Sequence, residues 1–296
     1  MPPAFLFRES NYSLKELRMK KFLFTMIAAV AAVSAVNAAD PSIGGDIGIS
    51  SKYVWRGLAF NEDRVFWPDV WASWNGITVT GFLSMDMTDK NTAVYGHNYQ
   101  SEVTDGDIYL DYTRAFGKIN GSIGVNQYFF PGYGKDTVLY KDDYGPVTEP
   151  YLKVGVPISH VCPSLVVDLD VPDKNVKNGL GKATGAYISP KISWSKPIGC
   201  ATPTIAMSIG YATKAHNSFF ALVDDAAGFQ DFTTTLQTVI APPAPLADYA
   251  TLTLSCNYSY LLNKKLRDAG YDDGHFWAGI TVNMFRTITC SKGDAK

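Results

Sequence analysis

The chain has 296 residues, a formal net charge of −2 at pH 7 and an aromatic content of 13%. Because the charge is nearly balanced, nothing indicates a nucleic-acid partner. Helix signals are sparse, and Gly, Thr, Ser, Asn and Asp recur between short segments, which is typical of an all-β protein. The sequence contains no Gly-rich phosphate loop, zinc motif or dinucleotide fingerprint. We therefore expect no cofactor, no metal ion and no enzymatic activity.

The N-terminal region has the pattern of a secretion signal. Met19, Lys20 and Lys21 precede an apolar run over 22–36, and small residues follow as far as Ala39. A positive start, an apolar core and a small-residue cleavage site are what a signal peptide requires, whereas a membrane anchor would need a longer apolar stretch. Three segments are predicted: a misassigned start or unstructured leader over 1–18, a cleaved signal peptide over 19–39, and one folded domain of 257 residues (296 minus 39) over 40–296.

Short segments that alternate between apolar and polar residues occupy the rest of the chain. Between Ile77 and Thr88 the odd positions are apolar and the even positions are almost all polar. Because successive strand residues point to opposite faces, such a segment has one apolar and one polar face. The same pattern predicts strands at 45–56, 66–75, 77–88, 107–116, 118–130, 149–158, 164–171, 186–195, 203–212, 250–262 and 275–289.

The positions of the aromatic residues distinguish two architectures that share this alternation. A soluble β-sandwich turns its apolar faces inward, whereas a membrane barrel turns them toward lipid. Aromatic residues on the apolar faces fall at strand ends, as expected for rings at membrane interfaces, and a sandwich core would hold them mid-strand. The predicted aromatic girdles are Tyr53, Trp55, Phe129, Tyr211, Tyr258, Tyr260 and Phe276 at the outer ends and Trp74, Tyr112, Phe116 and Trp194 at the inner ends.

Linker lengths also favour the barrel. Short linkers, such as the tight Asn75-Gly76 turn, alternate with longer ones, which is the pattern of periplasmic turns and outer loops. Eleven strands would leave the C-terminus outside the cell. Since bacterial barrels have an even number of strands, the β-prone but weakly alternating segment 228–240 is assigned as the twelfth. The predicted fold class is therefore all-β, a transmembrane antiparallel up-and-down β-barrel of 12 strands in the outer membrane.

Three short motifs in the predicted barrel domain resemble those of a known family. Ser51–Gly57, with the sequence SKYVWRG, resembles the S-x-Y-V-[FW]-R-G opening of the TorF-type outer-membrane porin family. Tyr128–Gly132 resembles the aromatic-Pro-Gly strand end of that family, and Glu149–Tyr151 resembles its E-x-Y strand start. The resemblance implies a porin without naming a substrate. The chain departs from the terminal-aromatic signal read by the barrel-assembly machinery, because eleven residues follow Phe285.

The polar strand faces predict a narrow aqueous lumen through which small hydrophilic solutes diffuse passively. The expected partners are these solutes, outer-membrane lipids and the barrel-assembly machinery. Because acidic side chains outnumber basic ones in the predicted lumen, we expect a weak preference for cations. The predicted lumen-lining charges are eight acidic (Asp46, Asp69, Asp86, Asp107, Asp111, Glu149, Asp168 and Asp170) and five basic (Lys52, Arg56, Lys118, Lys153 and Lys191).

Two other classes of function stay open at this point. One is a closed barrel with a structural or adhesive role, working through the long loops 89–106 and 213–227. The other is an outer-membrane lipase or protease. Ser259 and His275 lie on neighbouring predicted strands, but Ser259 is expected to face the lumen, whereas catalysis on lipids needs the other face. Asp272 and Asp273 beside His275 imitate a protease cluster, although a polar turn accounts for them better.

Four cysteines form an even set in an oxidising compartment. Cys256 is expected at a lipid-facing position and Cys290 near the periplasmic end. Cys162 and Cys200 occupy successive periplasmic turns, which two strands separate by roughly 10 Å. Turns leaning together would bring the Cα atoms within the ~7 Å that a disulfide requires. The predicted disulfide is Cys162–Cys200, with four free thiols as the alternative.

Overall fold

The fold is described from a computed structural model, which covers residues 40–90, 100–129, 147–172 and 184–288. The predicted leader and signal peptide over 1–39 lie outside the described residues, as does Cys290. No helix in the described part of the chain is long and apolar enough to span a membrane.

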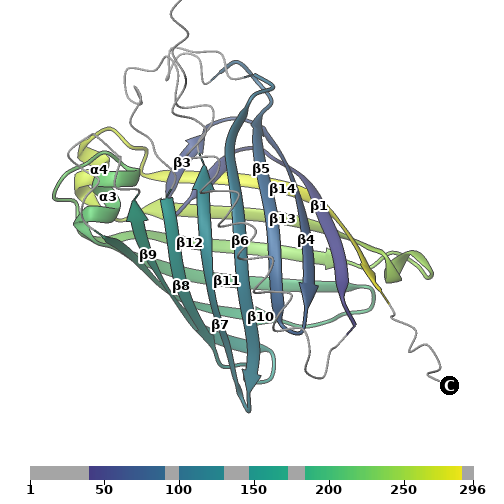
Figure 1. Ribbon diagram of the computed structural model, residues 1–296. Coiled ribbons are helices and arrows are strands. Elements are labelled where there is room, and N and C mark those ends of the chain that lie inside the picture. Colours follow the sequence, from purple (N-terminus) through teal and green to yellow (C-terminus); the bar gives the residue numbers. More distant parts are fainter. Residues whose placement is uncertain (1–39, 91–99, 130–146, 173–183, 289–296) are drawn as a thin grey trace, which may run out of the picture.

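Twelve strands close into an antiparallel up-and-down barrel, in which each strand pairs with its neighbours along the chain and the last pairs with the first (Figure 1). The predicted all-β, 12-strand antiparallel up-and-down barrel is thus confirmed, and the segment assigned by parity, 228–240, is a barrel strand. In chain order, the barrel strands are β1 (Ser42–Ser50), β4 (Val65–Trp74), β5 (Ile77–Asp86), β6 (Val103–Phe116), β7 (Ile119–Phe129), β8 (Val147–Gly155), β9 (Val161–Pro172), β10 (Gly185–Ser195), β11 (Ala201–Ala212), β12 (Gly228–Ile240), β13 (Ala250–Leu261) and β14 (Gly274–Thr287).

The two faces of the barrel wall differ in chemistry. Large apolar side chains such as Val70, Ile123 and Leu152 are exposed on the outer face. The inner face carries buried polar residues, including Ser84, Glu149 and Asp168. Because side chains alternate along each strand, one register produces both faces at once. A closed barrel with no unpaired strand edge and an apolar exterior is the arrangement expected of a barrel that crosses a membrane.

The first predicted strand, 45–56, is wrong in its second half. β1 ends at Ser50, and the chain then forms a separate hairpin of β2 (Tyr53–Trp55) and β3 (Leu58–Asn61). Arg56 and Gly57 make its turn with φ of 50° and 80°, the positive pair that a tight two-residue hairpin needs. The prediction failed because Arg56 continues the alternation and is an uncommon residue at such a φ. Tyr53 and Trp55 therefore belong to this hairpin and not to a lipid-facing girdle.

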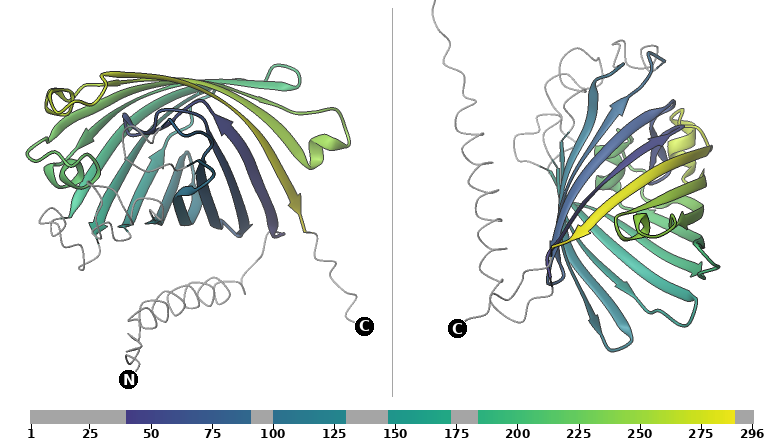
Figure 2. Two further views of the ribbon diagram at one scale, coloured as in Figure 1. Left: turned by 90° about the horizontal axis from the view of Figure 1, so that it is seen from above. Right: turned by 90° about the vertical axis from the view of Figure 1, so that its right-hand side faces the viewer.

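The hairpin packs inside one end of the barrel against two short helices, α3 (Lys214–Phe220) and α4 (Lys264–Asp268), which lie near that end (Figures 1 and 2). Hydrogen bonds from Asn263 to the carbonyl of Ala226 and from Tyr271 to that of Ala221 join the two helix-bearing loops. Buried apolar side chains gather between the hairpin, the helices and the barrel wall, and this group is here called the mouth cluster. It consists of Leu58, Tyr128, Val147, Phe219, Phe220, Ala221, Ala226, Leu261 and Leu266.

The opposite end of the barrel has short connections. Asn75-Gly76 and Gly117-Lys118 are tight turns, so Lys118 lies in a turn and not on a lumen-facing strand position as predicted. A longer connection there contains the short helix η3 (Leu246–Asp248). The alternation of short and long connections places the mouth cluster at the end with the long loops.

The predicted disulfide between Cys162 and Cys200 is not formed, because both cysteines are free, as is Cys256. Ser193 pairs with Cys162 on one side and with Ala206 on the other, which places Cys162 level with Ala206. Cys200 lies six residues before Ala206 along the chain, or about 20 Å at strand spacing. The prediction considered the distance across the strands and overlooked this stagger along them.

Candidate functional site

The tip of the β2–β3 hairpin places Arg56 in the barrel interior. Its side chain is only 9% exposed and meets three acidic residues from β8 and β9. Nη1 of Arg56 lies 2.7 Å from Glu149 Oε2 and 3.7 Å from Asp170 Oδ1, and Nη2 lies 3.0 Å from Asp168 Oδ2. The planar guanidinium presents several donors in a fixed fork, which suits it to bridging carboxylates from two strands. These contacts hold the hairpin tip against the far wall.

Aromatic rings enclose the same guanidinium. Its carbon lies 4.0 Å from the centre of the Trp55 ring and 4.4 Å from that of Tyr187. Each distance is within the range of a cation–π contact, which is strongest where water is excluded. The backbone of the turn is held as well, because Gln230 Nε2 donates to the carbonyl oxygen of Arg56 over 2.7 Å. Arg56 is thus held by ion pairs, stacking and a backbone hydrogen bond.

The carboxylates around Arg56 have further donors. Glu149 Oε1 accepts hydrogen bonds from Tyr128 Oη at 2.7 Å and from Asn126 Nδ2 at 3.1 Å. Tyr187, which stacks on Arg56, donates to Asp231 on β12 over 2.7 Å. A fully buried carboxylate is stable only with such partners. Donors from β7, β10, β12 and the hairpin therefore join the carboxylates of β8, β9 and β12 in one network across the lumen, with Arg56 at its centre.

His216 on α3 extends this network. Its Nδ1 lies 2.8 Å from Asp170 Oδ2, and its Nε2 is buried without a hydrogen-bond partner among the described residues. Burial lowers the pKa of His216 well below its ordinary value, and the positive charge of Arg56 lowers it further, while Glu149 opposes the shift. The ring is therefore neutral, with its proton on Nδ1 donated to Asp170. The pKa of Arg56 is raised, because its carboxylate partners outweigh the effect of burial.

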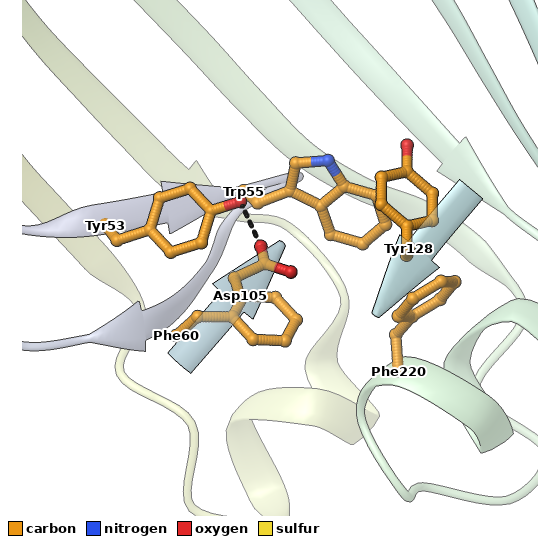
Figure 3. Close-up of a pocket in the computed structure, with 6 residues that line it drawn as sticks. All are labelled: Tyr53, Trp55, Phe60, Asp105, Tyr128 and Phe220. Carbon is orange, nitrogen blue, oxygen red and sulfur yellow. Dashed lines mark hydrogen bonds between the residues drawn. The ribbon is translucent and has the colours of Figure 1, made fainter. Parts of the chain in front are cut away.

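A second set of contacts lies beside the hairpin, between Tyr53 and β6. Tyr53 Oη donates to Asp105 Oδ2 over 2.8 Å, as Figure 3 shows. Phe60, Trp55 and Phe220 pack around this pair and leave a cavity of about 10 Å³, which has room for about one water molecule. This cavity is therefore a gap in the packing and too small to hold a solute.

The structure brings together four of the predicted lumen charges, namely Arg56, Glu149, Asp168 and Asp170. Others lie apart from them. Asp107 accepts a hydrogen bond from Tyr109, and Asp111 accepts one from Tyr151. Lys52 pairs with Glu62 in the loop after β3. The register places the remaining ones, Asp46, Asp69, Asp86, Lys153 and Lys191, on the inner face of the wall.

Several residues of the network were not predicted. His216 and Gln230 lie in or beside a long loop, where no periodicity indicated which way they point. Tyr128 belongs to a recognised motif, although its hydroxyl was not assigned a role. Tyr187 sits on a polar face that was considered only for its charges, and Asp231 lies on β12, whose weak alternation did not indicate a face. The one available signal was a polar aromatic residue on a lumen face, because a buried tyrosine hydroxyl needs a partner.

The predicted girdle residues other than Tyr53 and Trp55 lie on the outer face. Tyr211, Tyr258 and Phe276 are exposed near the long-loop end, and Phe116 and Trp194 are exposed near the other end. The register places the others, Phe129, Tyr260, Trp74 and Tyr112, on the same face.

The two residues considered for hydrolysis, Ser259 and His275, face the lumen and not the outer surface. Ser259 and His275 are partners in the register of β13 and β14, and both are buried on the inner face. The Ser259 hydroxyl lies 2.8 Å from that of Thr233. A lipase nucleophile would need a base beside it and access to lipid.

No protein-family model matches this chain, and no curated protein matches it. The chain is similar to the solved COG4313 outer membrane channel from Pseudomonas putida F1, with a TM-score of 0.51 and 11% identity over 86% of this chain and 97% of that one. It is also similar to the NanC porin, with a TM-score of 0.48 and 9% identity over 83% of this chain and 100% of that one. Identities this low show the fold alone. The chain therefore has the β-barrel fold that an outer-membrane channel also has.

Proposed function

We propose that this protein is a narrow outer-membrane channel through which small hydrophilic solutes diffuse. The observation that carries the proposal is the combination of an apolar outer face with a charged inner face on a closed barrel. Side chains on the inner wall, such as Lys153 and Lys191, offer hydrogen-bonding groups to a hydrated solute.

The β2–β3 hairpin forms the constriction of the proposed channel. It lies across the mouth and is tied to the opposite wall by Arg56. Arg56 is a single cation among three carboxylates, so the constriction carries a net negative charge and favours cations weakly. The predicted signal peptide and the lipid-covered exterior are consistent with export to the outer membrane. The solute class and this location are parts of the same proposal.

Recording from planar lipid bilayers tests the proposed function. Full-length protein extracted from membranes in detergent is added to one side, and the expected result is discrete conductance steps smaller than those of a wide trimeric porin. The matched control is the same preparation after boiling. Absence of steps from folded wild-type protein, together with absence of steps from an Arg56→Met variant, would contradict a channel role.

A closed barrel with a structural or adhesive role is the second candidate. The observation that favours it is the mouth cluster, in which Leu58, Leu261 and Leu266 are almost completely buried. Such packing closes part of the opening. Absence of conductance combined with binding of folded protein to a surface would support this candidate, because an adhesive role needs the outer loops and not the lumen.

A further inference from the structure

Three potential metal ligands meet where two loops at the mouth end come together. Glu62 follows β3, Asp272 lies between α4 and β14, and His275 is the second residue of β14. One ligand atom from each of these residues lies within 4.8 Å of the other two. Nδ1 of His275 is 3.6 Å from Oε1 of Glu62. Glu62 lies more than two hundred positions before Asp272 and His275 in the sequence, so only the closed barrel brings it beside them.

His275 supplies an independent indication of a ligand. Its side chain is only 3% exposed, and Nδ1 has no hydrogen-bond partner among the described residues. A buried ring nitrogen without a partner is unfavourable, and the 3.6 Å gap to Glu62 is too long for a hydrogen bond. Glu62 and Asp272 are exposed. An ion therefore has a route from solvent to the buried nitrogen past two carboxylates.

The distances and the ligand types suit zinc. Zinc binds imidazole nitrogen and carboxylate oxygen at about 2.1 Å, so two ligands of a tetrahedral ion lie about 3.4 Å apart. The separation of 3.6 Å between Nδ1 and Oε1 is close to that value. Exposed carboxylates can shift to close the remaining distance, and water completes a site with three protein ligands. Calcium and magnesium prefer sites made of oxygen alone, which makes the imidazole a reason to expect a transition metal.

We propose that His275 Nδ1, Glu62 and Asp272 bind a divalent transition-metal ion, zinc in the first place, at the mouth of the barrel. The ion ties the loop that contains the β2–β3 hairpin to the loop between β13 and β14. Lys52 pairs with the same Glu62 carboxylate in the ion's absence and therefore competes with it. This proposal concerns binding alone, so it stands or falls independently of whether the barrel conducts.

Isothermal titration of the folded, full-length protein with zinc chloride in detergent, after treatment with a chelator, tests the proposal. The expected result is about one zinc ion per chain. Asp272→Asn and Glu62→Gln weaken this binding, and His275→Ala abolishes it. Lys52→Gln strengthens it by about tenfold, because a nearby positive charge is removed. Titration with calcium and magnesium gives much weaker binding.

Two variants at the other end of the barrel serve as controls. His160→Ala and Asp248→Asn alter exposed residues in the connections at that end, far from the proposed ligands, and should leave zinc binding unchanged. Unheated electrophoresis in SDS establishes that each variant is folded. Should His275→Ala not fold, the exposed position of Asp272 lets Asp272→Asn carry the test. Lack of zinc binding by the wild type, zinc binding that persists in Asp272→Asn and Glu62→Gln, or a preference for calcium would overturn the proposal.

Discussion

At the scale of single residues, Arg56 and His216 are two basic side chains buried in the mouth around the same carboxylates. Arg56 is charged and faces Glu149, Asp168 and Asp170, whereas His216 is neutral and donates to Asp170. The carboxylates therefore hold both side chains in position. The two residues differ in what a substitution or a change of pH does to the network.

Replacement of Arg56 by Met leaves three carboxylates buried without their cation. We expect the free energy of unfolding to fall by about 3–5 kcal/mol, the usual cost of removing one partner from a buried ion pair. Urea unfolding followed by tryptophan fluorescence measures this change. Arg64→Met makes the same change at an exposed position just after the β2–β3 hairpin and is expected to leave the free energy of unfolding almost unchanged. Equal stability of the two variants would contradict the central place of Arg56.

The lowered pKa of His216 makes stability depend on pH. In the unfolded chain its pKa is about 6.5, so below that pH the unfolded state takes up a proton that the folded state does not bind. The neutral His216 ring therefore makes its full contribution to the free energy of unfolding above about pH 6.5, and this contribution is lost as the pH falls below that value.

His216→Gln removes this titration, and the loss of stability between pH 7 and pH 5 should be smaller in the variant than in the wild type. Urea midpoints at the two pH values measure the difference. The exposed His160 provides the control, because His160→Gln should leave the pH dependence as it is. An identical slope in His216→Gln and in the wild type would show that folding does not lower the pKa of His216, and would contradict this prediction.

At the scale of elements, the β2–β3 hairpin depends on how closely its turn approaches β12. A Cβ added at Gly57 would lie 2.5 Å from the Cβ of Asp231, and the φ of Gly57 is +80°. Gly117 also has a positive φ, of +63°, but has open space around it. Substitution of either glycine therefore strains the backbone at a positive φ. Only at Gly57 does the added side chain also collide with Asp231 on the barrel wall.

Gly57→Ala should destabilise the protein by about 1–3 kcal/mol more than Gly117→Ala does, which is the usual cost of forcing an atom into a packed site. Urea unfolding gives the total loss. Limited proteolysis shows whether the hairpin is released first, since undocking exposes Lys52 and Arg56 to trypsin. If both variants lose the same amount, the hairpin tip does not press against Asp231.

At the scale of the whole molecule, the closed hydrogen-bonded wall predicts that the folded protein resists unfolding by detergent. Each barrel strand is hydrogen-bonded to a neighbour on both sides, so the barrel has no exposed strand edge from which the hydrogen bonds could be broken one strand at a time. The folded protein should resist SDS without heating and should migrate differently after boiling, with a strand-dominated circular dichroism spectrum in detergent. A monomeric protein that stays soluble without detergent would be incompatible with the exposed apolar face.

The balance of charge inside the barrel leads to a prediction of selectivity. Acidic groups exceed basic ones on the inner wall, so a salt gradient should give a reversal potential of the sign for weak cation preference. Asp107→Asn together with Asp111→Asn should move this potential toward zero. Asp248→Asn, at an exposed position beyond the barrel wall, is the control and should leave it unchanged. Clear anion preference in the wild type would refute the prediction.

The sequence by itself determined the strands and their faces, because a period of two residues places every second side chain on the same side of a sheet. It also determined the twelfth strand, once the even-number rule was applied to the weak alternation of 228–240. What only the tertiary structure decided lies at the mouth. Whether Tyr53 and Trp55 continue a strand or turn inward depends on positive φ at Arg56, which that side chain does not signal.

The contacts of the mouth share a physical origin. Arg56 meets Glu149 across 93 positions of sequence, and Gln230 meets the carbonyl of Arg56 across 174. Local pattern carries no information about such pairs, since the closure of the barrel creates them. The same holds for Cys162 and Cys200, whose separation follows from the stagger of strands around the wall. Periodicity thus determined which side chains face inward, and the closed topology decided which of them meet.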